Sequence, residues 1–203
     1  MYETIAQNYL ADALKSFRDY KMLADKAMAQ VSEEEFFRAL NAESNSIAVI
    51  SKHLSGNMLS RWTDFLTTDG EKPSRRRDLE FAAAPENTRA TLLKQWEAGW
   101  QAVFIAVEPL QPQDLARSVN IRGQAHTVVE AINRQLTHYA SHIGQIILLA
   151  KHFRADAWQT LSIPRNRSTD FNQYLGEKLA SGENPGRQEA ALEFAADAIK
   201  KEQ

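Results

Sequence analysis

No cysteine occurs among the 203 residues of the chain. This absence excludes disulfide bonds, zinc sites with thiolate ligands and a cysteine nucleophile. It also fits a reducing compartment, and we expect a cytoplasmic protein. Long apolar runs are absent as well, because the longest, IGQIILLA, falls far short of the roughly 18–20 residues that cross a bilayer. The first residues lack the basic start and apolar core of a signal peptide. The sequence therefore predicts a protein with no membrane partner.

A large excess of charge of either sign is also missing. The formal net charge is −2 at pH 7, which gives no electrostatic reason to expect nucleic acid as a partner. The composition that remains is that of a globular protein, with 43% hydrophobic and 25% charged residues. A chain of this length and composition suits one domain with a tail.

Apolar residues recur at spacings of three or four along four stretches, which predicts four long helices. The expected ranges of these helices are 4–29, 46–65, 85–107 and 127–151. Capping boxes mark two helix starts. Ser32 with Glu35 opens a short helix through Leu40, and Thr127 with Glu130 opens the fourth long helix. The third long helix is expected to begin near Pro85, because proline suits the first turn.

Four amphipathic helices of this length favour an all-α fold, a four-helix bundle. The links at 66–85 and 108–126 are long for a minimal bundle, so we expect crossover connections. The segment 114–128 alternates weakly around a glycine and predicts a small hairpin insertion.

We expect the chain to divide after residue 153. Residues 1–153 would form the bundle, and residues 154–203 a C-terminal extension packed on the bundle or on a dimer partner. The stretch 158–186 reads as mostly irregular, and a short helix at 186–201 would close the chain.

Two histidines, His138 and His142, stand four residues apart on the fourth helix. One helical turn separates them, so both imidazoles can reach one cation. The spacing alone is a weak signal, and two part-exposed histidines bonded to neighbours or water are the alternative. His53 lies on another helix and could complete a three-histidine site with an open position, as in catalytic zinc or nickel centres.

The remaining histidines, His126 and His152, are poorer candidates, because one precedes the helix cap and the other lies at the helix end. Several familiar active-site motifs are absent. No H-E-x-x-H sequence occurs, which argues against a peptidase of that kind. Gln135 and Tyr139 occupy the positions where a di-iron carboxylate protein would carry glutamate. No phosphate-binding glycine loop and no G-x-S-x-G sequence is present either.

Three consecutive arginines at 75–77 precede the third helix. They could bind an anionic substrate group near a pocket mouth. We favour a solvated loop in which they pair with nearby carboxylates, namely Asp69, Glu71, Asp78 and Glu80. We interpret three tryptophans as core or interface residues, namely Trp62, Trp96 and Trp100. Weak candidates for substrate binding are Asn57, Tyr139 and Gln145, although packing is the simpler role for Tyr139.

The sequence HYASHIGQI and His53 in ISKHLSGNMLSRW carry a family resemblance over about residues 1–153. The chain resembles the DinB-like (DinB/YfiT-type) four-helix metalloenzymes through their H-x-x-x-H-x-G-Q signature. The RWTDFLTTDGEKP stretch is similar to a subgroup whose function is not assigned. The resemblance implies helices in an up-down-down-up order and a homodimer. It also implies that His53, His138 and His142 bind one divalent metal, usually zinc, nickel or iron.

Characterised members of the resembling family include bacillithiol transferases and a mycothiol-dependent maleylpyruvate isomerase, in which the metal is thought to activate a low-molecular-weight thiol. The resemblance thus suggests a metal-dependent enzyme acting on a small molecule, by thiol transfer or by hydrolysis through metal-bound water. Because the chain has no cysteine, a sulfur nucleophile would come from a cosubstrate. The alternative is a non-catalytic, dimeric stress-response protein that binds metal or a small ligand. No residue is assigned as catalytic, because no general base is evident beside the histidines.

Overall fold

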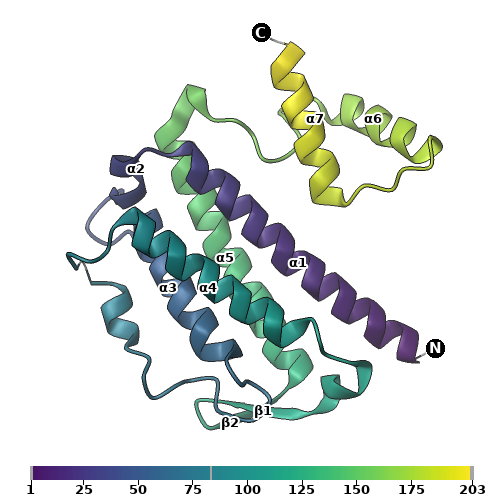
Figure 1. The fold of residues 1–203 in the computed structure, drawn as a ribbon. Coiled ribbons are helices and arrows are strands. Elements are labelled where there is room, and N and C mark those ends of the chain that lie inside the picture. Colours follow the sequence, from purple (N-terminus) through teal and green to yellow (C-terminus); the bar gives the residue numbers. More distant parts are fainter. Residues whose placement is uncertain (1, 83, 202–203) are drawn as a thin grey trace. The chain divides into compact units, whose positions relative to one another are not determined.

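The computed structural model of the protein describes residues 2–82 and 84–201, and it is mostly helical (Figure 1). The helices in the described part are α1 Tyr2–Gln30, α2 Glu33–Phe37, α3 Ile47–Trp62, α4 Arg89–Val107, α5 Val128–Arg154, α6 Ser168–Ala180 and α7 Arg187–Lys201. The strands are β1 Ser118–Ile121 and β2 Gln124–Thr127, and short 3-10 turns are η1 Arg77–Glu80, η2 Pro112–Ala116 and η3 Ala155–Ala157. None of these helices combines the length and apolar character needed to span a bilayer.

Contacts within the chain define two compact units, Met1–Phe153 and Arg154–Gln203. The first unit contains four long helices, namely α1, α3, α4 and α5, together with α2 and the two strands. The second unit contains α6 and α7. Each unit has buried apolar residues of its own.

An aromatic cluster forms the centre of the first unit, and each long helix contributes one ring to it. The rings are Phe17 of α1, Trp62 of α3, Trp100 of α4 and Tyr139 of α5. Phe17 lies 5.9 Å from Trp62 and 5.8 Å from Tyr139 between ring centroids, and Trp100 lies 5.7 Å from Tyr139. The interpretation of the tryptophans as core residues is therefore confirmed, since Trp62 is 3% exposed and Trp96 and Trp100 are fully buried. Contacts of this kind fix the rotation of each helix about its axis.

Both predicted capping boxes are present. The Ser32 hydroxyl accepts from Glu35 N at 3.2 Å, and the Glu35 carboxylate accepts from Ser32 N at 2.7 Å. Thr127 and Glu130 make the same reciprocal pair at the start of α5, with distances of 3.2 and 2.6 Å. The short helix α2 ends at Phe37, however, three residues before the expected Leu40.

Helix α5 extends three residues past its expected end, to Arg154, and two further helix ends differ from the expected positions. The helix α3 ends at Trp62 rather than at residue 65, because the backbone of Thr63 adopts an extended conformation. The helix α4 begins at Arg89 rather than near Pro85, because the Thr88 hydroxyl caps it by accepting from Thr91 N at 3.2 Å. A side-chain cap therefore sets the start of α4 in place of the proline.

The predicted hairpin is present as an antiparallel pair of strands, with Ser118 opposite Thr127 and Ile121 opposite Gln124. Its two-residue turn, Arg122 and Gly123, has positive φ at both positions, as a type I′ turn requires. The carboxylate of Asp69 accepts from the backbone N–H of Arg122 at 2.8 Å and of Gly123 at 2.7 Å. The hairpin thereby anchors the loop that follows α3.

The C-terminal unit has more regular structure than expected, because α6 lies within the stretch interpreted as irregular. The apolar residues of α6 that are packed in the unit are Phe171, Tyr174 and Leu175, which follow helical spacing inside a polar segment. They pack with residues of α7, namely Ala190, Ala191 and Phe194. These three residues give only a weak helical signal in the sequence, and packing against α7 stabilises the helix. The final helix, α7, is confirmed at Arg187–Lys201.

Candidate metal centre

Three histidines from two helices lie close together in the first unit. His53 comes from α3, and His138 and His142 come from α5. One ring nitrogen of each lies within 4.8 Å of the others, and the ring centroids are 4.8 to 5.4 Å apart. His53 is buried, whereas His138 and His142 are half-buried. The convergence expected from the sequence is therefore observed, and the three side chains could hold a single metal ion.

Helical spacing explains how two helices build this cluster. On α3, His53, Asn57 and Arg61 follow one another at intervals of four residues, so they share one face. On α5, Arg134, His138 and His142 repeat the same interval. The two faces each carry histidine toward one end and arginine toward the other.

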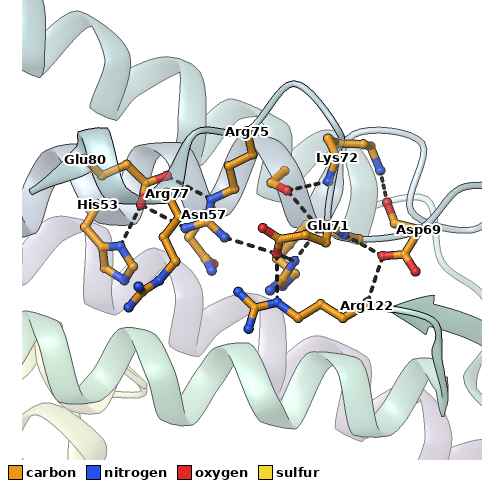
Figure 2. Close-up of polar contacts among 12 residues, drawn as sticks. His53, Asn57, Asp69, Glu71, Lys72, Arg75, Arg77, Glu80 and Arg122 are labelled. Carbon is orange, nitrogen blue, oxygen red and sulfur yellow. Dashed lines mark hydrogen bonds and ion pairs between the residues drawn. The ribbon is translucent and has the colours of Figure 1, made fainter.

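Glu80 fixes the orientation of the His53 ring (Figure 2). Its Oε2 lies 2.8 Å from His53 Nδ1, and both oxygens accept from Arg75, at 2.8 and 2.9 Å. Burial acts to raise the pKa of this carboxyl, but the hydrogen bonds from His53 and Arg75 outweigh it, so the pKa of Glu80 is lowered. An ionised Glu80 requires that His53 donate from Nδ1, which leaves the lone pair on Nε2. That Nε2 lies 3.4 Å from Nε2 of His138, inside the cluster.

Gly56 makes room for Glu80 beside α3. A Cβ atom at Gly56 would clash with Glu80 Oε1 and would lie 2.9 Å from Glu80 Cδ. Only glycine therefore allows the carboxylate to approach this turn of the helix closely enough to reach His53. Glycine normally costs a helix stability, and here its small size serves the packing of the centre.

His142 is oriented by a neighbour on its own helix. Its Nδ1 lies 2.8 Å from the amide oxygen of Gln145, which can only accept, so Nε2 keeps its lone pair. Burial, together with the neighbouring His142 and His53, lowers the pKa of His138 to about 3. Burial also lowers the pKa of His142. At neutral pH both imidazoles are uncharged, which is the form that binds a cation.

Tyr139, between the two histidines in sequence, belongs to the core. Its side chain is fully buried, and burial raises the pKa of its phenol. The hydroxyl accepts from Trp62 Nε1 at 3.0 Å and donates to Asn57 Oδ1 at 3.2 Å. Packing therefore accounts for Tyr139, and Asn57 lines a cavity together with His53. Substrate roles for Asn57, Tyr139 and Gln145 stay predictions.

The arginines at 75–77 are only partly as expected. The side chain of Arg75 is 4% exposed, so the interpretation of a solvated loop is wrong for this residue. Its pairing with Glu80 and Glu71 is confirmed, at 2.8 and 3.5 Å. Arg76 and Arg77 are exposed, as expected. Arg75 is buried together with Glu80, whose two carboxylate oxygens it binds through paired hydrogen bonds. The local sequence does not predict this pairing.

Glu80 and Arg75 are the residues around the candidate centre that sequence reasoning misses. The local sequence groups Glu80 with the other loop carboxylates, and its contact with His53 spans 27 residues. The remaining histidines lie apart from the cluster. The ring of His126 donates from Nδ1 to Gln124 O at 2.9 Å within the hairpin, and His152 is exposed near the end of α5.

Fold and site together define a mostly helical protein in which two helices bring three histidines together as a candidate metal centre. The chain belongs to the family described as "Protein of unknown function (DUF1572)", whose model matches residues 4–167. The match covers all three histidines and ends just before α6 begins at Ser168. Comparison with curated proteins and with solved structures gives no match.

Proposed function

We propose that the protein is a metal-dependent enzyme in which His53, His138 and His142 hold one divalent cation, zinc, nickel or iron. The observation that carries the proposal is the cluster itself, with three ring nitrogens within 4.8 Å of one another. The DinB-like resemblance supports it and is consistent with the family match. With it we propose a four-helix bundle in the up-down-down-up order, formed by α1, α3, α4 and α5.

The donor set fits such a cation. Three imidazoles leave an open position in a tetrahedral arrangement, as in catalytic rather than structural zinc sites. Glu80 and Gln145 each hold an Nδ1–H, so that His53 and His142 present Nε2 to the cluster. When bound, a divalent cation supplies Lewis acidity that lowers the pKa of a water or a thiol at its open position.

The reaction class we propose is transfer of a low-molecular-weight thiol or hydrolysis. Because the chain contains no cysteine, the thiol would be a cosubstrate. The residues of the chain hold the histidines in place, and a cavity lined by His53, His138 and Asn57 receives the small molecule. A homodimer is part of the proposal, and light scattering should give twice the 22.9 kDa mass of the chain.

One observation favours a second candidate, a non-catalytic protein that binds metal or a small ligand. The carboxylate that contacts His53, Glu80, already accepts from His53 and twice from Arg75. A general base needs a free acceptor within hydrogen-bond reach of the proton it removes. In the described residues, Glu80 therefore serves as an orienting group and not as a base.

Metal analysis of protein purified without added metal tests the centre. We expect close to one equivalent of a divalent metal per chain, and loss of that metal in His142→Ala. His152→Ala, on the same helix but outside the cluster, is the matched control and should keep its metal. Less than a tenth of an equivalent that is unchanged in His142→Ala would refute both metal-binding candidates.

Turnover then separates the enzyme from the binding protein. The metal-loaded protein is assayed with common low-molecular-weight thiols and a halogenated aromatic electrophile, and with ester substrates for hydrolysis. Turnover that disappears in His142→Ala supports the enzyme. Metal binding without turnover in either assay supports the non-catalytic candidate.

A further inference from the structure

A cavity of about 160 Å³ opens beside the histidine cluster. This volume is many times the roughly 10–15 Å³ that a single water needs. Arginine dominates its lining, which consists of His53, Asn57, Arg61, Arg75, Arg77, Arg122, Arg134, Gln135 and His138. Figure 2 shows Arg77 and Arg122 extending toward the space beside His53 and Asn57.

The arginines of the cavity outnumber the carboxylates that pair with them. Glu80 pairs with Arg75, and Glu71 is shared by Arg61 at 2.8 Å, Arg75 at 3.5 Å and Arg122 at 3.3 Å. Two carboxylates thus serve three of the five guanidinium groups.

The other two arginines of the cavity, Arg77 and Arg134, are less well compensated. Among the carboxylates of the described residues, Arg77 pairs with Asp78, at 3.8 Å, and that carboxylate is 99% exposed. Arg134 has no carboxylate within ion-pair distance among the residues that the structure describes. The cavity therefore carries an excess of positive charge at the exposed Arg77 and Arg134, while the side chains of Arg61 and Arg75 are buried.

Two buried polar atoms of the lining residues lack partners in the described part of the chain. They are Nε of Arg61 and Oε1 of Gln135, whose residues are 6% and 2% exposed. A buried donor without an acceptor is destabilising, so such atoms are uncommon. Both residues line the cavity, so an anion bound there lies beside one residue with an unpaired donor and one amide whose oxygen makes no hydrogen bond.

The helical register gives a scale for the separation of the arginines from the histidines along the helix axes. Arg134 precedes His138 by four residues, and Arg61 follows His53 by eight. At 1.5 Å per residue these steps correspond to about 6 and 12 Å along the helix axes. Guanidinium groups bind carboxylate and phosphate oxygens by paired hydrogen bonds.

We propose that the arginine-lined cavity binds the anionic group, a carboxylate or a phosphate, of the small molecule whose reacting end lies at the three histidines. The part of the proposal that concerns the reacting end rests on the proposed function. The anion site itself depends only on the arginines, so it forms in the metal-free protein as well. The substrate is then an elongated molecule with an anionic group about 6–12 Å from the atom that reacts.

Calorimetric titration of the metal-free, full-length protein with inorganic phosphate and with succinate tests the anion site. We expect binding of at least one of them, and a rise in Kd of at least tenfold in Arg77→Gln/Arg134→Gln and in Arg134→Gln alone. Arg117→Gln, an exposed arginine paired with Asp114 outside the cavity, is the matched control and should bind as the unmodified protein does. Tighter binding of phosphate or of succinate identifies the anionic group.

A second titration tests whether one molecule binds both the metal and the arginines. Zinc-loaded protein is titrated with 6-mercaptohexanoate and with 6-mercaptohexanol, its uncharged counterpart. We expect the carboxylate to bind at least tenfold more tightly, and the difference to vanish in Arg77→Gln/Arg134→Gln. Failure of zinc to bind would refute the proposed function and leave the first titration to decide on the anion site. No binding of either anion by the metal-free protein, or equal Kd values in the arginine variants, would overturn the proposal.

Discussion

The carboxylate of Glu80 lies 2.8 Å from His53 Nδ1, although the two residues are 27 positions apart in the chain. Both are buried, at 7% and 5% exposure, so this contact is shielded from water. A hydrogen bond to a charged acceptor in such a place is stronger than one at the surface. It decides which nitrogen of His53 faces the other two histidines, and it therefore belongs to the centre as much as the histidines do.

Replacing Glu80 by glutamine should weaken metal binding about 10–100-fold, the usual effect of losing the partner that orients a ligand. The introduced amide can keep one hydrogen bond to His53, but it lacks the charge of the carboxylate and loses one of the bonds to Arg75. Competition with a chromophoric chelator measures the affinity. Glu86→Gln, an exposed carboxylate in the same loop, is the control. Equal affinities in the two variants would show that Glu80 does not orient a ligand.

Gly56→Ala and Gly144→Ala should change stability in opposite directions. Alanine stabilises an exposed helix position by roughly 0.5–1 kcal/mol relative to glycine, and a Cβ at Gly144 meets nothing within 4 Å. At Gly56 the same methyl group would lie 2.9 Å from Glu80 Cδ, so the carboxylate must move away from His53. We expect lower stability and weaker metal binding for Gly56→Ala alone, measured by urea unfolding and chelator competition. A stabilised Gly56→Ala with unchanged affinity would contradict this account.

Tyr139→Phe should lower the free energy of unfolding by about 1–3 kcal/mol, because it leaves Trp62 Nε1 and Asn57 Oδ1 without their partner in the core. The ring itself stays, so packing against Phe17 and Trp100 is retained. The metal content should therefore not change, since α5 keeps its rotation. Denaturant unfolding and metal analysis of the same preparation check both statements. Loss of metal at unchanged stability would instead place the hydroxyl in the centre.

The stability of the protein should fall in acid partly through Glu71. Burial acts to raise the pKa of this carboxyl, but Arg61, Arg75 and Arg122 outweigh it and lower the pKa. A lowered pKa in the folded state means that the contribution to stability is complete above the ordinary glutamate pKa of about 4.3 and is lost as pH falls through the folded value.

Glu71→Gln tests the contribution of this carboxylate. The variant should be less stable than the unmodified protein at pH 7, by about 1–3 kcal/mol for lost hydrogen bonds to a charged group. The difference should begin to shrink below a pH of about 4.3, where the unfolded chain takes up the proton, and should be lost as the pH falls through the lower pKa of the folded carboxyl. Melting temperatures across that range give the comparison. A difference that stays constant with pH would exclude Glu71 as its source.

The histidine helix is predictable because its signals are local. Thr127 and Glu130 mark its start, and its apolar stripe includes the fully buried Tyr139. Those features set the rotation of α5, and the rotation places His138 and His142 on one face. The convergence of His53 on that pair is only a hypothesis at the level of sequence, since one sequence does not show how two helices pack. The aromatic cluster, with one ring from each long helix, provides that packing.

The contacts from the loop are not predictable in the same way. Arg75 and Glu80 lie in a stretch rich in both charges, where many pairings are possible. Their choice of partner depends on Gly56, whose missing side chain admits the carboxylate. The helix α6 is hard to predict for a related reason. Its few apolar residues are buried by packing against Phe194 of α7, a contact that the local sequence does not show.

The histidines stand on two helices, whereas several of the charged residues around them come from the connection between α3 and α4. That connection supplies Glu71, Arg75, Arg77 and Glu80. This connection thus contributes charged groups to the cavity without carrying any of the three histidines. A library of variants confined to Arg76 and Arg77, with Glu80 and Arg75 held constant, should leave the three imidazoles in place while changing the charge around the cavity. Under the proposed function, such changes would let one helical scaffold serve different small molecules.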